Sequence, residues 1–124
     1  MVQRAIASRA AVEIDTRLRE RYFGTLELGP DSAYESVWLR DASDADSEFD
    51  QVESANRVMA RVTGLIVDLE RRYTDASLLL VSHGDALQIL QTAFARRPAS
   101  AHRQLQHLQT AEIRPLSLTE SAAG

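Results

Sequence analysis

An apolar run that stops at a histidine and a glycine constrains the fold of this chain more than any other feature. The run is LLLVSHGDALQIL at residues 78–90, and turn residues precede it. A continuous apolar segment of this length is typical of a parallel strand covered on both faces, so we predict a central strand at residues 77–82. Gly84 and Asp85 then open a helix that ends near Pro98. The predicted buried side of this helix carries Leu87, Leu90, Ala93 and Phe94.

The rest of the chain alternates between helix and strand patterns. A short strand is predicted around Val12 and Ile14, and an edge strand at residues 111–118, because Pro115 cannot donate a ladder hydrogen bond. The clearest helix has apolar residues at spacings of three and four, namely Val52, Ala55, Met59, Val62, Ile66 and Leu69. A further N-terminal helix is predicted through Ala5, Ile6 and Ala10. Helices that alternate with strands indicate an α/β layer architecture.

The domain organisation follows from length and from one acidic segment. With 124 residues, of which 44% are hydrophobic, residues 1–124 are predicted to form a single domain. Residues 25–50 are rich in Asp, Ser and Gly and are predicted to be a surface insertion. Tyr34 and Trp38 lie four residues apart and are expected to anchor one short helix there. Residues 119–124 are predicted to be a frayed tail.

Charge and composition exclude several classes of function. The formal net charge of −4 and the pI near 5.3 argue against a nucleic-acid partner, which would require a basic face. The absence of cysteine excludes disulfides and thiolate metal sites. No apolar stretch approaches the roughly 20 residues that span a bilayer. We therefore expect a soluble cytoplasmic protein without a membrane partner.

The histidine at the strand end is the first candidate functional residue. Ligands of open α/β sheets bind beyond the carboxyl ends of the strands, where a following helix also offers free N–H groups. His83 is predicted to lie there, and its imidazole can bind an anion or transfer a proton at neutral pH. Gly84 would let the backbone approach a ligand. The alternative is that His83 only begins the helix and bonds to a neighbouring carbonyl, and spacing does not decide between the two.

A second candidate is Glu20 in RLRERYFG, residues 17–24. Flanking arginines lower a carboxyl pKa whereas burial against aromatic rings raises it, so the segment fits either an ion pair or a general acid. Arg57 and Arg61, four residues apart, are interpreted as the polar face of their helix. His102 and His107 are interpreted as loop histidines. A zinc site built from His83, His102 and His107 would have suitable ligand types, but the spacing does not support it.

Three segments together resemble the histidine phosphatase superfamily, which includes the cofactor-dependent phosphoglycerate mutases. LLLVSHGDALQILQT, at residues 78–92, resembles the later signature of the family, and RLRERYFGTLE, at residues 17–27, resembles its middle signature. VESANRVMARVTGLIVDLERRY resembles its long helix with regularly spaced arginines. The resemblance implies a phosphoglycerate mutase-like α/β fold, a three-layer sandwich in which helices flank a mostly parallel sheet.

The resemblance also implies roles for individual residues. His83 matches the histidine that hydrogen-bonds the transferring phosphoryl group, and Glu20 matches the acid that protonates the leaving oxygen. The surrounding phosphate-binding set would be Arg19, Arg21, Tyr22, Ser82 and Gly84. Positioning and charge neutralisation dominate phosphoryl transfer, so the resemblance implies no metal and no cofactor. The implied partner is a phosphorylated small molecule, and a homodimer is consistent with the family.

One departure from the family is serious. The family opens with a strand that ends in Arg-His-Gly and supplies the phosphorylated histidine, whereas the single His-Gly of this chain is at residue 83 and follows serine. Arg4 and Arg9, candidates for a further phosphate-binding arginine, lie too close to Glu20. The fold is therefore expected to be incomplete at the N-terminus, with strand edges left without partners. By resemblance the chain acts on phosphomonoesters through a phosphohistidine mechanism but is expected to be inactive alone. The alternative is a non-catalytic phosphate-binding or interaction remnant.

Overall fold

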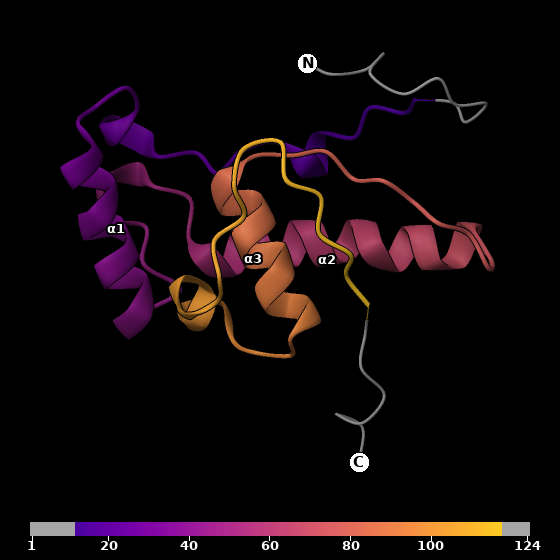
Figure 1. Cartoon of the computed structure of the whole chain (residues 1–124). Helices are drawn as coiled ribbons and strands as arrows, with labels where there is room; N and C mark the ends of the chain where they lie inside the picture. The colour runs from indigo at the N-terminus through magenta and orange to yellow at the C-terminus, as the bar shows by residue number, and fades with distance from the viewer. Residues whose placement is uncertain (1–11, 118–124) are drawn as a thin grey trace.

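The computed structural model describes residues 12–117, which form helices joined by extended segments (Figure 1). The α-helices are α1 at Asp31–Ser43, α2 at Ala55–Arg72 and α3 at Gly84–Phe94. The short 3₁₀ helices are η1 at Thr16–Leu18, η2 at Gly24–Leu26, η3 at Phe49–Gln51 and η4 at Ala99–Gln104. In Figure 1, α3 crosses α2, and α1 stands to one side next to η4. The predicted N-terminal helix and frayed tail lie outside the described residues.

The helix predicted from apolar periodicity is confirmed as α2. It begins after Ser54, whose hydroxyl accepts a hydrogen bond from the backbone N–H of Arg57 at 3.1 Å. A serine at this position satisfies one of the amides that the first helical turn leaves free. The residues buried along α2 are Ala55, Val58, Val62, Leu65 and Leu69. Local periodicity therefore located the helix and part of its buried side, since the predicted Met59 and Ile66 are only partly buried and the buried Val58 and Leu65 were not predicted.

The main core lies where α2, α3 and η4 meet. Its buried members are Ala55, Val58, Val62, Ala86, Ile89, Leu90 and Ala99. Of the side predicted to be buried on α3, Leu90 lies in the core and Leu87 and Phe94 pack against it while partly exposed, but the burial of Gln88 and Thr92 was not predicted. Gln88 and Thr92 are buried because α3 packs against α2 on one side and against η4 on another side. On the side that faces η4, the Gln88 side-chain amide donates hydrogen bonds to the backbone carbonyls of His102 and Leu105.

The predicted sheet is not confirmed, because no strand is formed within residues 12–117. Residues 76–83 run in an extended conformation from the end of α2 back to the start of α3, as Figure 1 shows. The prediction that residues 77–82 are covered on both faces is wrong for this structure, since Leu78, Leu79 and Val81 are 47%, 54% and 57% exposed. A strand needs backbone hydrogen bonds to a neighbour, and among the described residues none joins the backbone of residues 77–82 to another segment. The segments around Ile14 and Ile113 are likewise extended and exposed.

The acidic region at residues 25–50 contains the predicted helix, which extends over the 13 residues of α1. It is more than a surface excursion, because Val37 and Asp41 of α1 are buried. Val37 packs with Phe23 and Val52 in a second, smaller apolar cluster, which Tyr34 also contacts. The region therefore packs onto the rest of the described structure through the buried residues of α1. None of the described helices is long and apolar enough to cross a membrane.

Candidate functional site

The segment that carries Glu20 is fixed to α2 by a buried arginine. The Arg61 guanidinium donates to both carboxylate oxygens of Glu53, at 2.9 and 3.0 Å. Its remaining N–H groups donate to the backbone carbonyls of Arg17, Arg19 and Glu20. A planar guanidinium can serve a carboxylate and several carbonyls at once, which a lysine cannot. Arg61 therefore positions the backbone of residues 17–20.

The Glu20 carboxylate lies at the N-terminus of α3. One oxygen accepts from the backbone N–H of Asp85 at 3.2 Å, and the other accepts from the N–H of Ala86 at 3.0 Å. His83, the residue before α3, makes no side-chain capping bond, so Glu20 serves as the cap from 65 residues away in sequence. An anion is favoured at this end of a helix because of the free N–H groups and the helix dipole. Oε1 also accepts from the Arg21 N–H at 2.8 Å, so Oε2, which accepts only the Asp85 amide, is the oxygen with a lone pair left to carry a proton.

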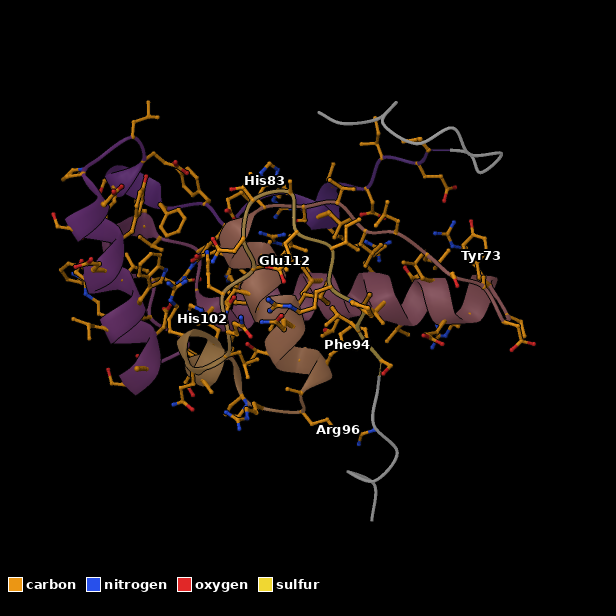
Figure 2. All side chains as sticks on the ribbon, viewed as in Figure 1. Tyr73, His83, Phe94, Arg96, His102 and Glu112 are labelled. Atoms are coloured by element: carbon orange, nitrogen blue, oxygen red, sulfur yellow. The ribbon has the colours of Figure 1, made fainter. Side chains whose placement is uncertain are left out.

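The structure places the other predicted site residues unequally. His83 is exposed and lies at the N-terminal end of α3, as Figure 2 shows, directly before Gly84. An ideal Cβ added to Gly84 would lie 3.8 Å from a Glu20 carboxylate oxygen, so the start of α3 and Glu20 are adjacent. The Ser82 hydroxyl donates to the Leu18 carbonyl at 2.6 Å, which ties the extended segment to the Glu20 segment.

Arg21, which the sequence assigned to phosphate binding, is the centre of a buried ionic cluster instead. Its guanidinium is fully buried and makes a bidentate pair with Asp41, at 2.6 and 2.8 Å. It also donates to Asp85 at 3.3 Å and to the Glu53 carbonyl at 2.8 Å. With these donors committed and no exposed surface, the side chain does not suit phosphate binding in this arrangement. We therefore do not keep Arg21 in the candidate phosphate site.

His102 belongs to the same cluster and is not a loop histidine, which corrects that prediction. It lies in η4, fully buried, with Nε2 2.8 Å from a carboxylate oxygen of Asp41. Because an ionised carboxylate can only accept, Nε2 carries the proton. Figure 2 shows His102 at η4, beside α1. The cluster thus joins the Glu20 segment, α1 and α3 through ion pairs of Arg21, and η4 through the hydrogen bond between His102 and Asp41.

The electrostatics of the cluster favour its ionised form. Burial by itself would raise the pKa of Asp41, but hydrogen bonds from Arg21 and His102 outweigh it and hold that pKa below its ordinary value. Burial alone would lower the pKa of Arg21, and its bonds to Asp41 and Asp85 raise it above the usual value. Burial likewise opposes the bonds from Arg61 and the Tyr22 amide at Glu53, and the pKa of Glu53 is lowered on balance.

An open cavity of about 690 Å³ lies against the Glu20 end of α3. Five predicted site residues are in its lining, namely Arg19, Glu20, Arg21, Tyr22 and Gly84. Aromatic rings from Phe23, Tyr34 and Trp38 and the imidazole of His107 complete most of its wall. The Tyr22 side chain is 54% exposed, whereas Phe23 is buried and packs on Tyr34 with ring centroids 4.5 Å apart. The structure therefore brings together two segments that are about 60 residues apart in the chain.

Within the part of the chain that the structure describes, no three His, Asp or Glu side chains are arranged to hold a metal ion. His83, His102 and His107 accordingly do not form the zinc site considered from their residue types. His102 is bound to Asp41, and His107 lines the cavity.

The family relationship is shown by a match along almost the whole chain. The model of the histidine phosphatase superfamily (branch 1) matches residues 2–123. The chain belongs to the histidine phosphatase superfamily. The resemblance inferred from three sequence segments is thereby confirmed. The search of the curated proteins found no match.

Solved structures agree with this assignment. The chain is similar to two mycobacterial proteins, described as mycobacterial hydrolase 2 and mycobacterial hydrolase 1. The TM-scores are 0.64 and 0.63, and the sequence identity to each is 25%. It is also similar to a mycobacterial glucosyl-3-phosphoglycerate phosphatase in complex with VO₃, with a TM-score of 0.60 and 26% identity. Each match covers 79% of this chain but only 47%, 51% and 53% of the matched structures, respectively. The chain therefore spans about half the length of these relatives and shares the fold of that half.

Two residues that build the candidate site were missed by sequence reasoning. Asp41 lay in a segment interpreted as a surface insertion, and Arg61 was interpreted as surface because it follows Arg57 at helical spacing. In the structure the Arg61 side chain is 10% exposed and that of Arg57 is 72% exposed. The available signal was Glu53, which directly precedes the Ser54 cap and could have suggested an acidic partner for an arginine two turns further on.

Proposed function

We propose that this chain binds a phosphomonoester at the junction of Glu20 and the N-terminus of α3. In this proposal His83 donates a hydrogen bond to the phosphoryl group, and Glu20 delivers a proton to the leaving oxygen. Arg19, which is exposed and lines the cavity, supplies positive charge to the substrate. The observation that carries the proposal is the convergence of Glu20 with the residue pair His83-Gly84 across more than 60 residues of sequence.

The chemistry suits phosphoryl groups because the site already favours an anion. Free N–H groups at a helix N-terminus, an imidazole and a guanidinium stabilise the charge that develops on a phosphoryl group. The carboxylate of Glu20 currently accepts the Asp85 and Ala86 amide bonds. Of the two oxygens, Oε2 accepts only the Asp85 amide, so it can carry the proton that a general acid needs, and a phosphate oxygen that took over the Asp85 amide would leave Oε2 fully available.

We further propose that this chain alone does not turn over substrate through phosphohistidine. The three histidines of the sequence are His83, His102 and His107, and no Arg-His-Gly occurs in the 124 residues. His102 is committed to the buried cluster, and His83 has the role of phosphate ligand. Without a nucleophile, covalent turnover loses its acceptor, which typically costs several powers of ten in rate.

A second candidate function is phosphate binding without catalysis. The observation in its favour is that both carboxylate oxygens of Glu20 accept backbone amides, as a purely structural helix cap would. In this case Glu20 holds α3 in place and His83 alone meets the ligand. The two candidates differ in whether Glu20→Gln, which can still accept at one oxygen, affects chemistry or only stability.

The test combines ligand binding with turnover. Isothermal titration with vanadate and with inorganic phosphate measures binding, and release of p-nitrophenol from p-nitrophenyl phosphate measures hydrolysis. We expect His83→Ala to weaken vanadate binding at least tenfold, an effect of the size of one charge-assisted hydrogen bond. The control is Arg57→Ala, because the Arg57 side chain is exposed and pairs only with Glu48 among the described residues. Equal vanadate binding by His83→Ala and the unmodified chain would contradict the proposal.

Turnover separates the two candidates. Hydrolysis that depends on both His83 and Glu20 would favour catalysis, and phosphoryl transfer to a histidine, detected by mass spectrometry at mildly basic pH, would contradict the proposed inactivity of the chain alone. Binding without hydrolysis in the unmodified chain is expected from both candidates, because the chain alone lacks a nucleophile in either case.

A further inference from the structure

The cavity beside Glu20 has walls that a small, highly charged substrate would not need. Four aromatic side chains line it, namely Tyr22, Phe23, Tyr34 and Trp38. Three of these rings are held in place by their neighbours. Phe23 packs on Tyr34, and the Trp38 indole N–H donates to Asp85 at 3.1 Å while the Arg103 guanidinium lies 3.8 Å from the ring centroid. A fixed aromatic wall offers a flat apolar group a surface at little entropic cost.

Tyr22 differs from the other three rings. It is more than half exposed, although its backbone N–H is fixed by a hydrogen bond to Glu53 at 3.1 Å. A large exposed ring beside a fixed aromatic wall gains most by packing against a ligand, because its apolar surface is otherwise left in water. Tyr22 is therefore the side chain that would cover a flat group placed in the cavity.

The charges of the cavity argue in the same direction. Two arginines line it, Arg19 and Arg21, against three acidic residues, Glu20, Glu27 and Asp85. Arg21 and Asp85 are both buried and paired with each other, so a ligand meets Arg19 as the one exposed arginine of this lining, against the acidic side chains of Glu20 and Glu27. A substrate with a second anionic group would meet acidic side chains without a further free guanidinium to balance it. The cavity can hold one phosphate but disfavours a polyanion.

We propose that the phosphomonoester bound here carries an aromatic or similarly flat apolar group, which occupies the cavity between Tyr22 and the wall of Phe23, Tyr34 and Trp38. This inference rests on the proposed function, because it assigns the substrate class of the same site. His107, which also lines the cavity, can hydrogen-bond polar atoms on the edge of such a group. Tyr22 is the specificity-determining residue in this arrangement.

The single tryptophan of the chain makes the test direct, because Trp38 itself lines the cavity. The full chain is titrated with phenyl phosphate, inorganic phosphate and 3-phosphoglycerate, and binding is followed by Trp38 fluorescence and by calorimetry. We expect phenyl phosphate to bind roughly tenfold more tightly than inorganic phosphate, as stacking on several rings would give. We expect 3-phosphoglycerate, which adds a carboxylate instead of a ring, to gain nothing over inorganic phosphate.

Variants at Tyr22 assign the preference to the ring. Tyr22→Phe should keep the ratio of the two affinities, phenyl phosphate to inorganic phosphate, and Tyr22→Ala should clearly reduce that ratio, because only the rings of the opposite wall remain. Tyr73→Ala is the matched control, because Tyr73 is a partly exposed tyrosine at the end of α2 that does not line the cavity. Circular dichroism of each variant verifies that the helices are intact.

The outcomes separate this inference from the proposed function. Phosphate binding that depends on His83 but shows no preference for phenyl phosphate would overturn the inference and keep the proposed function. Tighter binding of 3-phosphoglycerate than of phenyl phosphate would have the same meaning. Phenyl phosphate binding that depends on Tyr22 but not on His83 would overturn the proposed function and keep the aromatic compartment. If none of the three ligands binds, both are overturned.

Discussion

Replacing Arg21 by methionine is the change that tests the structure most directly. The guanidinium lies between the buried carboxylates of Asp41 and Asp85, whose side chains are 2% and 6% exposed. Methionine fills a similar volume without charge, so both carboxylates would be left in the interior without their main counter-ion. Removing one partner of a buried ion pair typically costs about 3–5 kcal/mol. A loss of this size is a large share of the roughly 5–15 kcal/mol that stabilises an ordinary domain.

The measurement is urea denaturation followed by helical circular dichroism, which gives the free energy of unfolding in water. Arg57→Met is the matched control, because it removes the same group from a side chain that is 72% exposed. Exposed ion pairs contribute about 0–1 kcal/mol, so Arg57→Met should lower the free energy of unfolding by no more than that. A double variant, Arg21→Met with Asp41→Leu, should recover part of the loss, since a buried pair can be replaced by apolar residues at little cost. If Arg21→Met were no more destabilising than Arg57→Met, the buried cluster would not exist as described.

Two further predictions concern acid and one glycine. The pKa values of Asp41 and Glu53 are lowered in the folded chain, so the stability that these two carboxylates contribute is fully present above their unfolded values of 3.8 and 4.5 and is lost as the pH falls below those values. Urea titrations from pH 7 to pH 3 should show a falling free energy of unfolding. Asp41→Asn should make this fall smaller. Gly24 has φ of +59°, and a Cβ there would lie 2.2 Å from the Asp50 carbonyl oxygen. Gly24→Ala should therefore lower the free energy of unfolding, measured by thermal denaturation, by about 1–3 kcal/mol. Gly64→Ala, in the middle of α2 with nothing within 4 Å, should instead stabilise by about 0.5–1 kcal/mol, and a stabilising Gly24→Ala would contradict the turn described here.

The sequence predicted well wherever the controlling interactions are local. The period of apolar residues in α2 identified that helix, because every third or fourth side chain falls on one face. The His-Gly at residues 83–84 marked the start of α3. The family was also accessible from sequence, since three short segments in the right order carry its signature, and the superfamily model confirms it.

Prediction failed where a residue depends on partners far away in the chain. Residues 77–82 have the composition of a buried strand, but an apolar run becomes a strand only when neighbouring chain completes its hydrogen bonds and covers its faces. Arg21 and Arg19 have the same side chain and lie two residues apart, yet one is buried against Asp41 and the other is exposed. Nothing in the local pattern distinguishes them.

The sequence by itself therefore located α2 and α3, because backbone propensity and apolar period act over a few residues, and its three signature segments indicated the family that the superfamily model shows. Only the tertiary structure decided which charged groups form the site. Arg61 donates hydrogen bonds to the backbone of the Glu20 segment, whereas Arg57 is exposed to solvent, although both arginines lie on α2 only four residues apart. Burial makes the difference, because a charge removed from water must find its counter-charge in space, and here the counter-charges of Arg21, Asp41 and Asp85 come from segments 20 to 64 residues apart.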